Sequence, residues 1–78
     1  MSSKKSPFGG FRGLLVVLGG GESGVGTALL AKKKDYTVFV SDKGTIAGKY
    51  RKVLLHNDIL FEEGRHTEGK IFEADIVM

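Results

Sequence analysis

The stretch that decides the fold runs from Leu14 to Gly26 and reads LLVVLGGGESGVG. Its first five residues form an unbroken apolar run, which is typical of a short strand buried on both faces of a parallel sheet. Glycines then occupy positions 19, 20, 21, 24 and 26. The residues that follow recur at helical spacing, with one face made of Val25, Ala28, Leu29 and Lys32. The stretch therefore predicts a strand, a glycine-rich turn and a helix.

A second strand-and-helix unit follows the first. The run Thr37–Ser41 predicts a strand that ends at Asp42. Apolar residues then recur at the spacing of one helical stripe, and we expect this second helix to bury Ile46, Tyr50, Val53 and Leu54. Asn57 suits a left-handed cap at the end of that helix.

A third unit is shorter. Ile59–Glu62 predicts a strand that breaks at Gly64, and Thr67 is placed to cap a third helix. We expect the buried side of this helix to consist of Ile71, Phe72 and Ala74. The last three residues, Ile76–Met78, predict the beginning of a fourth strand.

Strands that alternate with helices indicate a parallel sheet with right-handed crossovers and helices on its faces. We predict a Rossmann-like α/β fold of about four strands and three helices, with residues 14–78 as one domain and residues 1–13 as a disordered basic leader. A strand that stops after three apolar residues leaves a sheet edge unpaired. We therefore expect a domain truncated at its C-terminus, cut from a larger enzyme and inactive by itself.

The charge excludes one class of function. The net charge is +3, and Lys4, Lys5 and Arg12 account for it within a leader that has no acidic residue. The rest of the chain is neutral, so no electrostatic footprint for nucleic acid is left. The chain has no cysteine, which excludes disulfides and thiolate metal sites. No stretch has the length of a membrane span, and we expect no membrane partner.

The residues Gly19 to Gly24 fit the G-x-G-x-x-G pattern between a strand and a helix. The first glycine permits a tight turn, Gly21 lets a pyrophosphate approach the backbone, and Gly24 lets the helix pack closely on the strand. Free N–H groups at the start of the helix, reinforced by its dipole, bind an anion. Ser23 has a second interpretation, because its hydroxyl suits a helix cap.

Asp42 follows Gly24 by 18 positions, at the carboxyl end of the second predicted strand. That edge of an open α/β sheet binds the ribose or base end of a nucleotide, and the alternative without a function is a glycine-rich turn with a solvated aspartate. Other candidate chemistry is sparse. His56 and His66 lack a nearby ligand cluster, so no metal site is predicted. Two adjacent glutamates, at positions 62 and 63, point to opposite faces of a strand, which argues against a carboxylate pair.

Five segments of the sequence resemble the amino-terminal domain of the Mur ligases, and among these the branch that adds D-glutamate in peptidoglycan synthesis. The resemblance covers residues 14–78 and rests on Val16–Gly26, Ala31–Lys34, Val38–Asp42, Glu62–Glu68 and Ala74–Val77. It implies a cytoplasmic ligase of three domains. The first domain would bind the UDP end of UDP-N-acetylmuramoyl-L-alanine. The central domain would use ATP and magnesium to phosphorylate its carboxylate, and the last would position D-glutamate for attack.

The resemblance also implies roles for single residues. The backbone amides at Glu22 and Ser23 would meet the diphosphate, within a UDP-binding loop that includes Gly21 and Gly24. Asp42 and Lys43 would lie beside the uracil, and Gly64 would line the same pocket. No residue of this chain is assigned a catalytic role, and no cofactor is expected within it. Two other interpretations stay open: an NAD- or FAD-binding module of a dehydrogenase or regulator, because Asp42 suits a ribose hydroxyl equally, and a freestanding structural domain.

Overall fold

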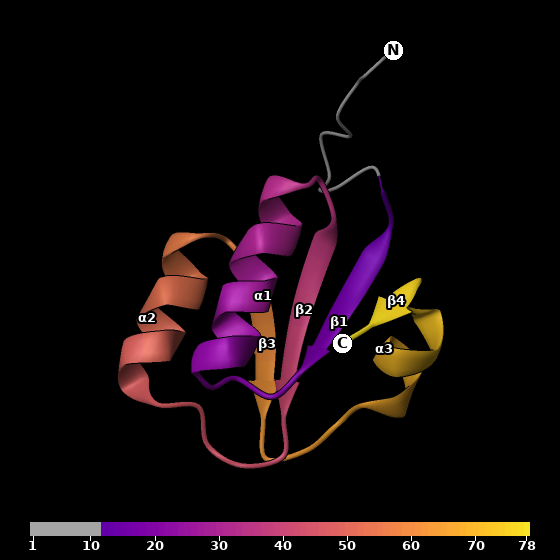
Figure 1. The fold of residues 1–78 in the computed structure, drawn as a ribbon. Helices are drawn as coiled ribbons and strands as arrows, with labels where there is room; N and C mark the ends of the chain where they lie inside the picture. The colour runs from indigo at the N-terminus through magenta and orange to yellow at the C-terminus, as the bar shows by residue number, and fades with distance from the viewer. Residues whose placement is uncertain (1–11) are drawn as a thin grey trace.

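The computed structural model describes residues 12–78, which form seven alternating elements (Figure 1). The predicted disordered leader lies almost wholly outside the described residues. In chain order the elements are β1 (Leu14–Leu18), α1 (Glu22–Lys33), β2 (Thr37–Asp42), α2 (Gly48–His56), β3 (Leu60–Glu63), α3 (Glu68–Glu73) and β4 (Ile76–Val77).

The four strands form one parallel sheet in the order β3-β2-β1-β4, which confirms the predicted Rossmann-like fold. The chain moves outward from β1 through β2 to β3. It then crosses back over β2 and β1 and places β4 on the other side of β1. The register aligns Val16 with Phe39 and with Val77, and Phe39 with Leu60. Strand order therefore reverses at β1, the strand that leads into the glycine loop.

The main core lies between the sheet and the two longer helices, α1 and α2, which cover the same face (Figure 1). Alternate residues of β1 and β2 point into it, as the two-residue period of a strand requires. Two members of the predicted stripe of α1, Val25 and Ala28, are buried, and Leu29 and Lys32 are half-buried. Ala31, outside the predicted stripe, is buried as well. The cluster of buried apolar residues is completed by Leu15, Val17, Val38, Val40, Ile46, Leu54 and Ile59.

The opposite face is covered only in part, by the short helix α3. Lys70 of this helix places its Nζ 5.6 Å from the centre of the Phe39 ring. One apolar residue of each strand lies in a row across this face, in the order Leu60, Phe39, Val16 and Val77. Val16 is fully buried, whereas Leu60 at one end of the row is 70% exposed.

The prediction of a buried side for α3 is wrong at Phe72, which is 83% exposed. Ile71 and Ala74 are half-buried. Adjacent residues of a helix point about 100° apart, so Ile71 and Phe72 cannot both face the sheet, and Ala74 lies just beyond the end of α3.

Three further local predictions are corrected at the helix ends. Ile46 is a core residue but precedes α2 instead of lying in its stripe. Asn57 has φ −106° and is therefore not left-handed, and the left-handed residue after α2 is Asp58, with φ 56°. Thr67 stands at the start of α3 without capping it, because its hydroxyl donates to the Glu62 carboxylate instead. Within residues 12–78, no helix combines the length and apolar character that crossing a membrane requires.

Candidate functional site

The glycine loop between β1 and α1 has the geometry that its spacing predicts. Gly19 adopts φ 111°, which favours glycine, and its N–H donates to the Ser41 carbonyl oxygen at 2.7 Å. A Cβ atom on Gly24 would overlap the carbonyl oxygen of Gly19, so α1 begins pressed against the end of β1. The predicted tight turn and close packing are thus confirmed. A Cβ on Gly21 would meet nothing within 4 Å, so this position faces open space.

The Ile46 side chain packs against Gly20. Gly20 is buried, and a Cβ atom there would lie 2.7 Å from the Ile46 side chain. The residue therefore has to be small, because the isoleucine that precedes α2 occupies the space. This contact fixes the glycine loop against the loop that follows β2.

The first turn of α1 starts without a side-chain cap. Gly21 is the N-cap residue and has no side chain to offer, and Ser23 lies inside the first turn, so the interpretation of Ser23 as the cap is wrong. The first intrahelical bond runs from Val25 N–H to the Gly21 carbonyl at 2.9 Å. The N–H groups ahead of it, at the positive end of the helix dipole, belong to the exposed residues Glu22 and Ser23 and to the half-buried Gly24.

Asp42 ties two loops together. One carboxylate oxygen accepts from the Gly20 N–H at 2.7 Å, and the other accepts from the Gly44 N–H at 2.8 Å. These two backbone donors, Gly20 first, lower the pKa of Asp42 below its ordinary value, and the nearby His66 imidazole acts in the same direction. Asp42 is thus at the predicted edge, with both oxygens already engaged by backbone.

The loops after all three neighbouring strands meet at this carboxyl edge. The Gly64 N–H donates to the Gly44 carbonyl at 3.0 Å, and Gly64 adopts φ 78°. Glu63 accepts from the Ile46 N–H at 2.7 Å and pairs with Arg51 at 3.4 Å. The structure brings all the predicted site residues to this edge, namely Gly21, Glu22, Ser23, Gly24, Asp42, Lys43 and Gly64.

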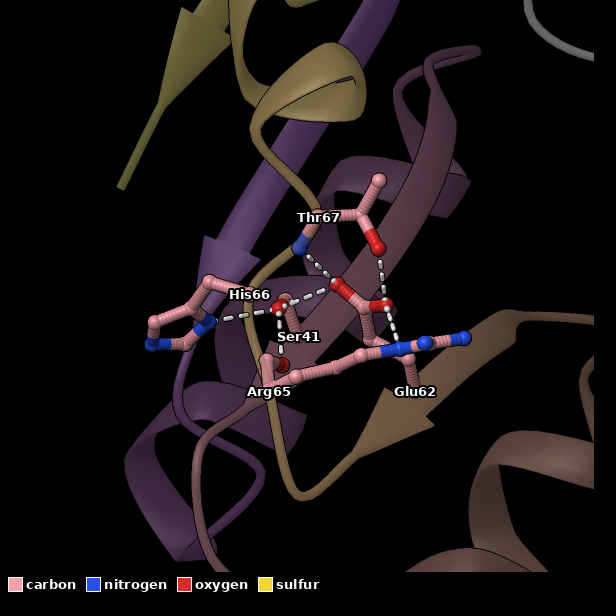
Figure 2. A network of polar contacts seen from close by, with 5 residues as sticks. All are labelled: Ser41, Glu62, Arg65, His66 and Thr67. Carbon is pink, nitrogen blue, oxygen red and sulfur yellow. Dashed lines mark hydrogen bonds and ion pairs between the residues drawn. The ribbon is translucent and has the colours of Figure 1, made fainter.

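A polar network that the sequence did not reveal lies on the other side of the same loops (Figure 2). The hydroxyl of Ser41, which is fully buried, lies 2.7 Å from a Glu62 oxygen, 2.6 Å from His66 Nδ1 and 3.2 Å from the Arg65 carbonyl. Glu62 also accepts from the Thr67 hydroxyl at 2.6 Å and from the Thr67 N–H at 2.7 Å.

Hydrogen bonds to the carboxylate lower the pKa of Glu62 from 4.5 to about 2. The two bonds from Thr67 have the largest effect, and the Ser41 hydroxyl adds to it. Arg65 adds an ion pair at 3.5 Å. As predicted, Glu62 and Glu63 point to opposite faces, since one contacts Ser41 and the other contacts the start of α2. The one signal for this network in the sequence is Ser41 itself, a small polar residue at an inward position of an apolar strand.

We expect Asp42→Ala to cost about 1–2 kcal/mol of unfolding free energy, because it leaves the buried Gly20 N–H without an acceptor. Urea denaturation of the free protein measures this cost. Lys43→Ala is the matched control, since Lys43 is the exposed neighbour of Asp42. Equal stability of the two variants would show that Asp42 does not tie the loops together.

A parallel sheet with a glycine loop at the point where strand order reverses, followed by a helix with open first-turn amides, is typical of Rossmann-like α/β domains. Comparison with known proteins places the chain more narrowly. The family described as the MurD N-terminal domain matches residues 15–78, and the chain belongs to this family.

Relatives of the chain are named UDP-N-acetylmuramoylalanine–D-glutamate ligase. This chain is 62% identical over 64 residues to the protein of that name from Christiangramia forsetii. The match covers 82% of this chain and 14% of the relative. The corresponding Porphyromonas gingivalis protein is 62% identical over 60 residues, covering 77% of this chain and 13% of the relative. The Bacteroides fragilis protein is 53% identical over 64 residues, covering 82% of this chain and 14% of the relative. The chain thus spans about one seventh of these relatives, and no solved structure gave a significant match.

Proposed function

We propose that this chain binds the UDP end of UDP-N-acetylmuramoyl-L-alanine, as the first domain of a ligase that adds D-glutamate. The observation that carries the proposal is the uncapped start of α1 beside Gly21, where exposed amides and open space coincide. Such a helix start binds phosphate groups through its N–H donors and its dipole. Family membership and the names of the relatives support the choice of a UDP-linked substrate.

Two parts of the carboxyl edge of the sheet would hold the two ends of the UDP group. The amides of Glu22, Ser23 and Gly24 receive the diphosphate, and Gly21 leaves room for it. The base lies near Asp42, Lys43 and Gly64, whose loops are already joined through Gly44. Each Asp42 oxygen keeps a second lone pair, so it accepts from the base while it holds the loops.

Ligation itself is assigned to the rest of the longer protein. The relatives extend far beyond the matched segment, and we propose that ATP, magnesium and D-glutamate are bound there. In that mechanism ATP phosphorylates the substrate carboxylate and the amine of D-glutamate displaces the phosphate. We also propose that the parent enzyme works in the cytoplasm, where the ATP it consumes is available. The 78-residue chain alone is expected to be inactive as a ligase.

The affinities for UDP and for NADH should distinguish a UDP-binding domain from a dinucleotide-binding module. We expect UDP to bind with a dissociation constant on the order of hundreds of micromolar, since one half of a site provides few contacts. Separate NMR titrations should shift the amides of residues 20–24 while those of Lys33 and Lys34, at the far end of α1, stay still. Tenfold tighter binding of NADH would favour the dinucleotide function. Absence of a response to either ligand would favour a purely structural domain.

A further inference from the structure

The polar network around Ser41 determines whether Nδ1 of His66 donates or accepts. A serine hydroxyl has one proton, and three groups compete for it: Glu62 Oε2, the Arg65 carbonyl and His66 Nδ1. Glu62 is ionised and accepts only, as does the carbonyl. If Nδ1 also accepted, the Ser41 oxygen would face the carboxylate at 2.7 Å with no proton between them. His66 Nδ1 therefore carries hydrogen and donates to Ser41.

This assignment excludes one function and points to another. Ser41, His66 and Glu62 are the residue types of a hydrolytic triad, but a protonated Nδ1 takes no proton from the serine. The Ser41 hydroxyl is also fully buried. What remains available on His66 is the other ring nitrogen, Nε2. The network anchors the ring by one nitrogen and leaves the second for another partner.

The ring is placed next to the glycine loop. The carbonyl of Ser41 accepts from Gly19 N–H while its hydroxyl holds His66, so one residue connects both. His66 is also near enough to Asp42, which binds Gly20, to favour the ionised carboxylate. Figure 2 shows the imidazole extending from Ser41 on the side away from Glu62 and Thr67, with β1 ending behind it in this view.

We propose that His66 is a second contact for the diphosphate, donating from Nε2–H to a phosphate oxygen held at the start of α1. The inference rests on the proposed UDP site and adds to it a residue from the loop after β3. The proton on Nε2 comes from solvent as the dianion binds, so the imidazolium balances part of the ligand's charge. The charged groups nearby are Asp42, Glu62, which shares the Ser41 hydroxyl with the ring, and Arg65, whose guanidinium pairs with Glu62.

His66→Asn is the variant that isolates this contact. Its side-chain amide replaces the Nδ1–H donor to Ser41 and removes Nε2, so the loop keeps its anchor. We expect UDP to bind about tenfold more weakly, because a charge-assisted hydrogen bond is lost. The affinity for uridine, which lacks the phosphates, should change less than about twofold. Unchanged amide shifts of Gly64 and Thr67 in the free variant establish that the loop is intact.

Nitrogen NMR of the wild-type 78-residue chain gives a readout that needs no variant. Free His66 should be protonated at Nδ1, and saturation with UDP should move the Nε2 resonance to that of a protonated nitrogen. An unprotonated Nδ1, or normal UDP affinity in His66→Asn, would overturn the role of His66 and leave the UDP site standing. Failure of the wild-type chain to bind UDP would instead overturn the proposed function, and this inference with it.

Discussion

Replacing Gly24 with alanine is expected to unfold the domain. The added methyl group would overlap the carbonyl oxygen of Gly19, which is backbone and cannot rotate away. Overpacking costs typically about 1–3 kcal/mol and more when backbone has to move, so we expect about 3 kcal/mol or more here. The hydrophobic core of a chain this short rarely supplies more than about 3–5 kcal/mol. Circular dichroism and urea denaturation should show the loss.

Gly26→Ala provides the matched control two positions along the same helix. A Cβ atom on Gly26 would meet nothing within 4 Å, and the residue is exposed inside α1. Alanine in a helix interior is favoured over glycine by about 0.5–1 kcal/mol, so this variant should be more stable than the parent. If both variants had the same stability, the close approach of α1 to the end of β1 would be refuted.

Glu62→Gln is expected to remove on the order of 2–3 kcal/mol of unfolding free energy at neutral pH. The groups that contact the carboxylate are all donors, namely the Ser41 hydroxyl, the Thr67 hydroxyl and N–H, and the Arg65 guanidinium. An amide keeps the shape of the side chain but turns one acceptor into a further donor. The cost is therefore the loss of an acceptor that the loop before α3 depends on.

The stabilisation by Glu62 should decrease as the pH falls. Folding lowers the pKa of Glu62 from 4.5 to about 2, so its contribution is complete above about pH 4.5 and is lost as the pH falls towards 2. Urea denaturation near pH 7 and near pH 3 should show the stabilities of parent and Glu62→Gln converging in acid. Glu73→Gln, at an exposed position of α3, is the control for loss of charge alone. A constant difference between parent and Glu62→Gln at both pH values would contradict the role of the carboxylate.

The order of elements and the parallel sheet could be predicted because each strand is a short apolar run and each turn is marked by glycine or a polar residue. The first strand was predicted residue for residue. The glycine loop was predictable for the same reason, since the spacing of Gly19 and Gly24 corresponds to contacts that only glycine tolerates.

Long-range partners could not be predicted in the same way. The contacts of Ser41 come from residues 21 to 25 positions away, and no local pattern specifies which side chains arrive there. Thr67 was expected to cap α3 because threonine before a helix usually does so. The half-buried Glu62 carboxylate accepts from its hydroxyl instead, since a charged acceptor binds a donor more strongly than a neutral one.

The strand order has a consequence for how the domain folds. The β1, β2 and β3 strands are neighbours both along the chain and in the sheet, so their pairing closes short loops. The β4 strand pairs instead with β1, and the Asp75 carboxylate that opens it reaches back 61 positions to the Leu14 N–H. Closing a longer loop costs more chain entropy, and β4 offers only two residues in return. We therefore expect assembly to proceed from a nucleus of β1, β2 and β3, with β4 as the last strand to join and the first to detach.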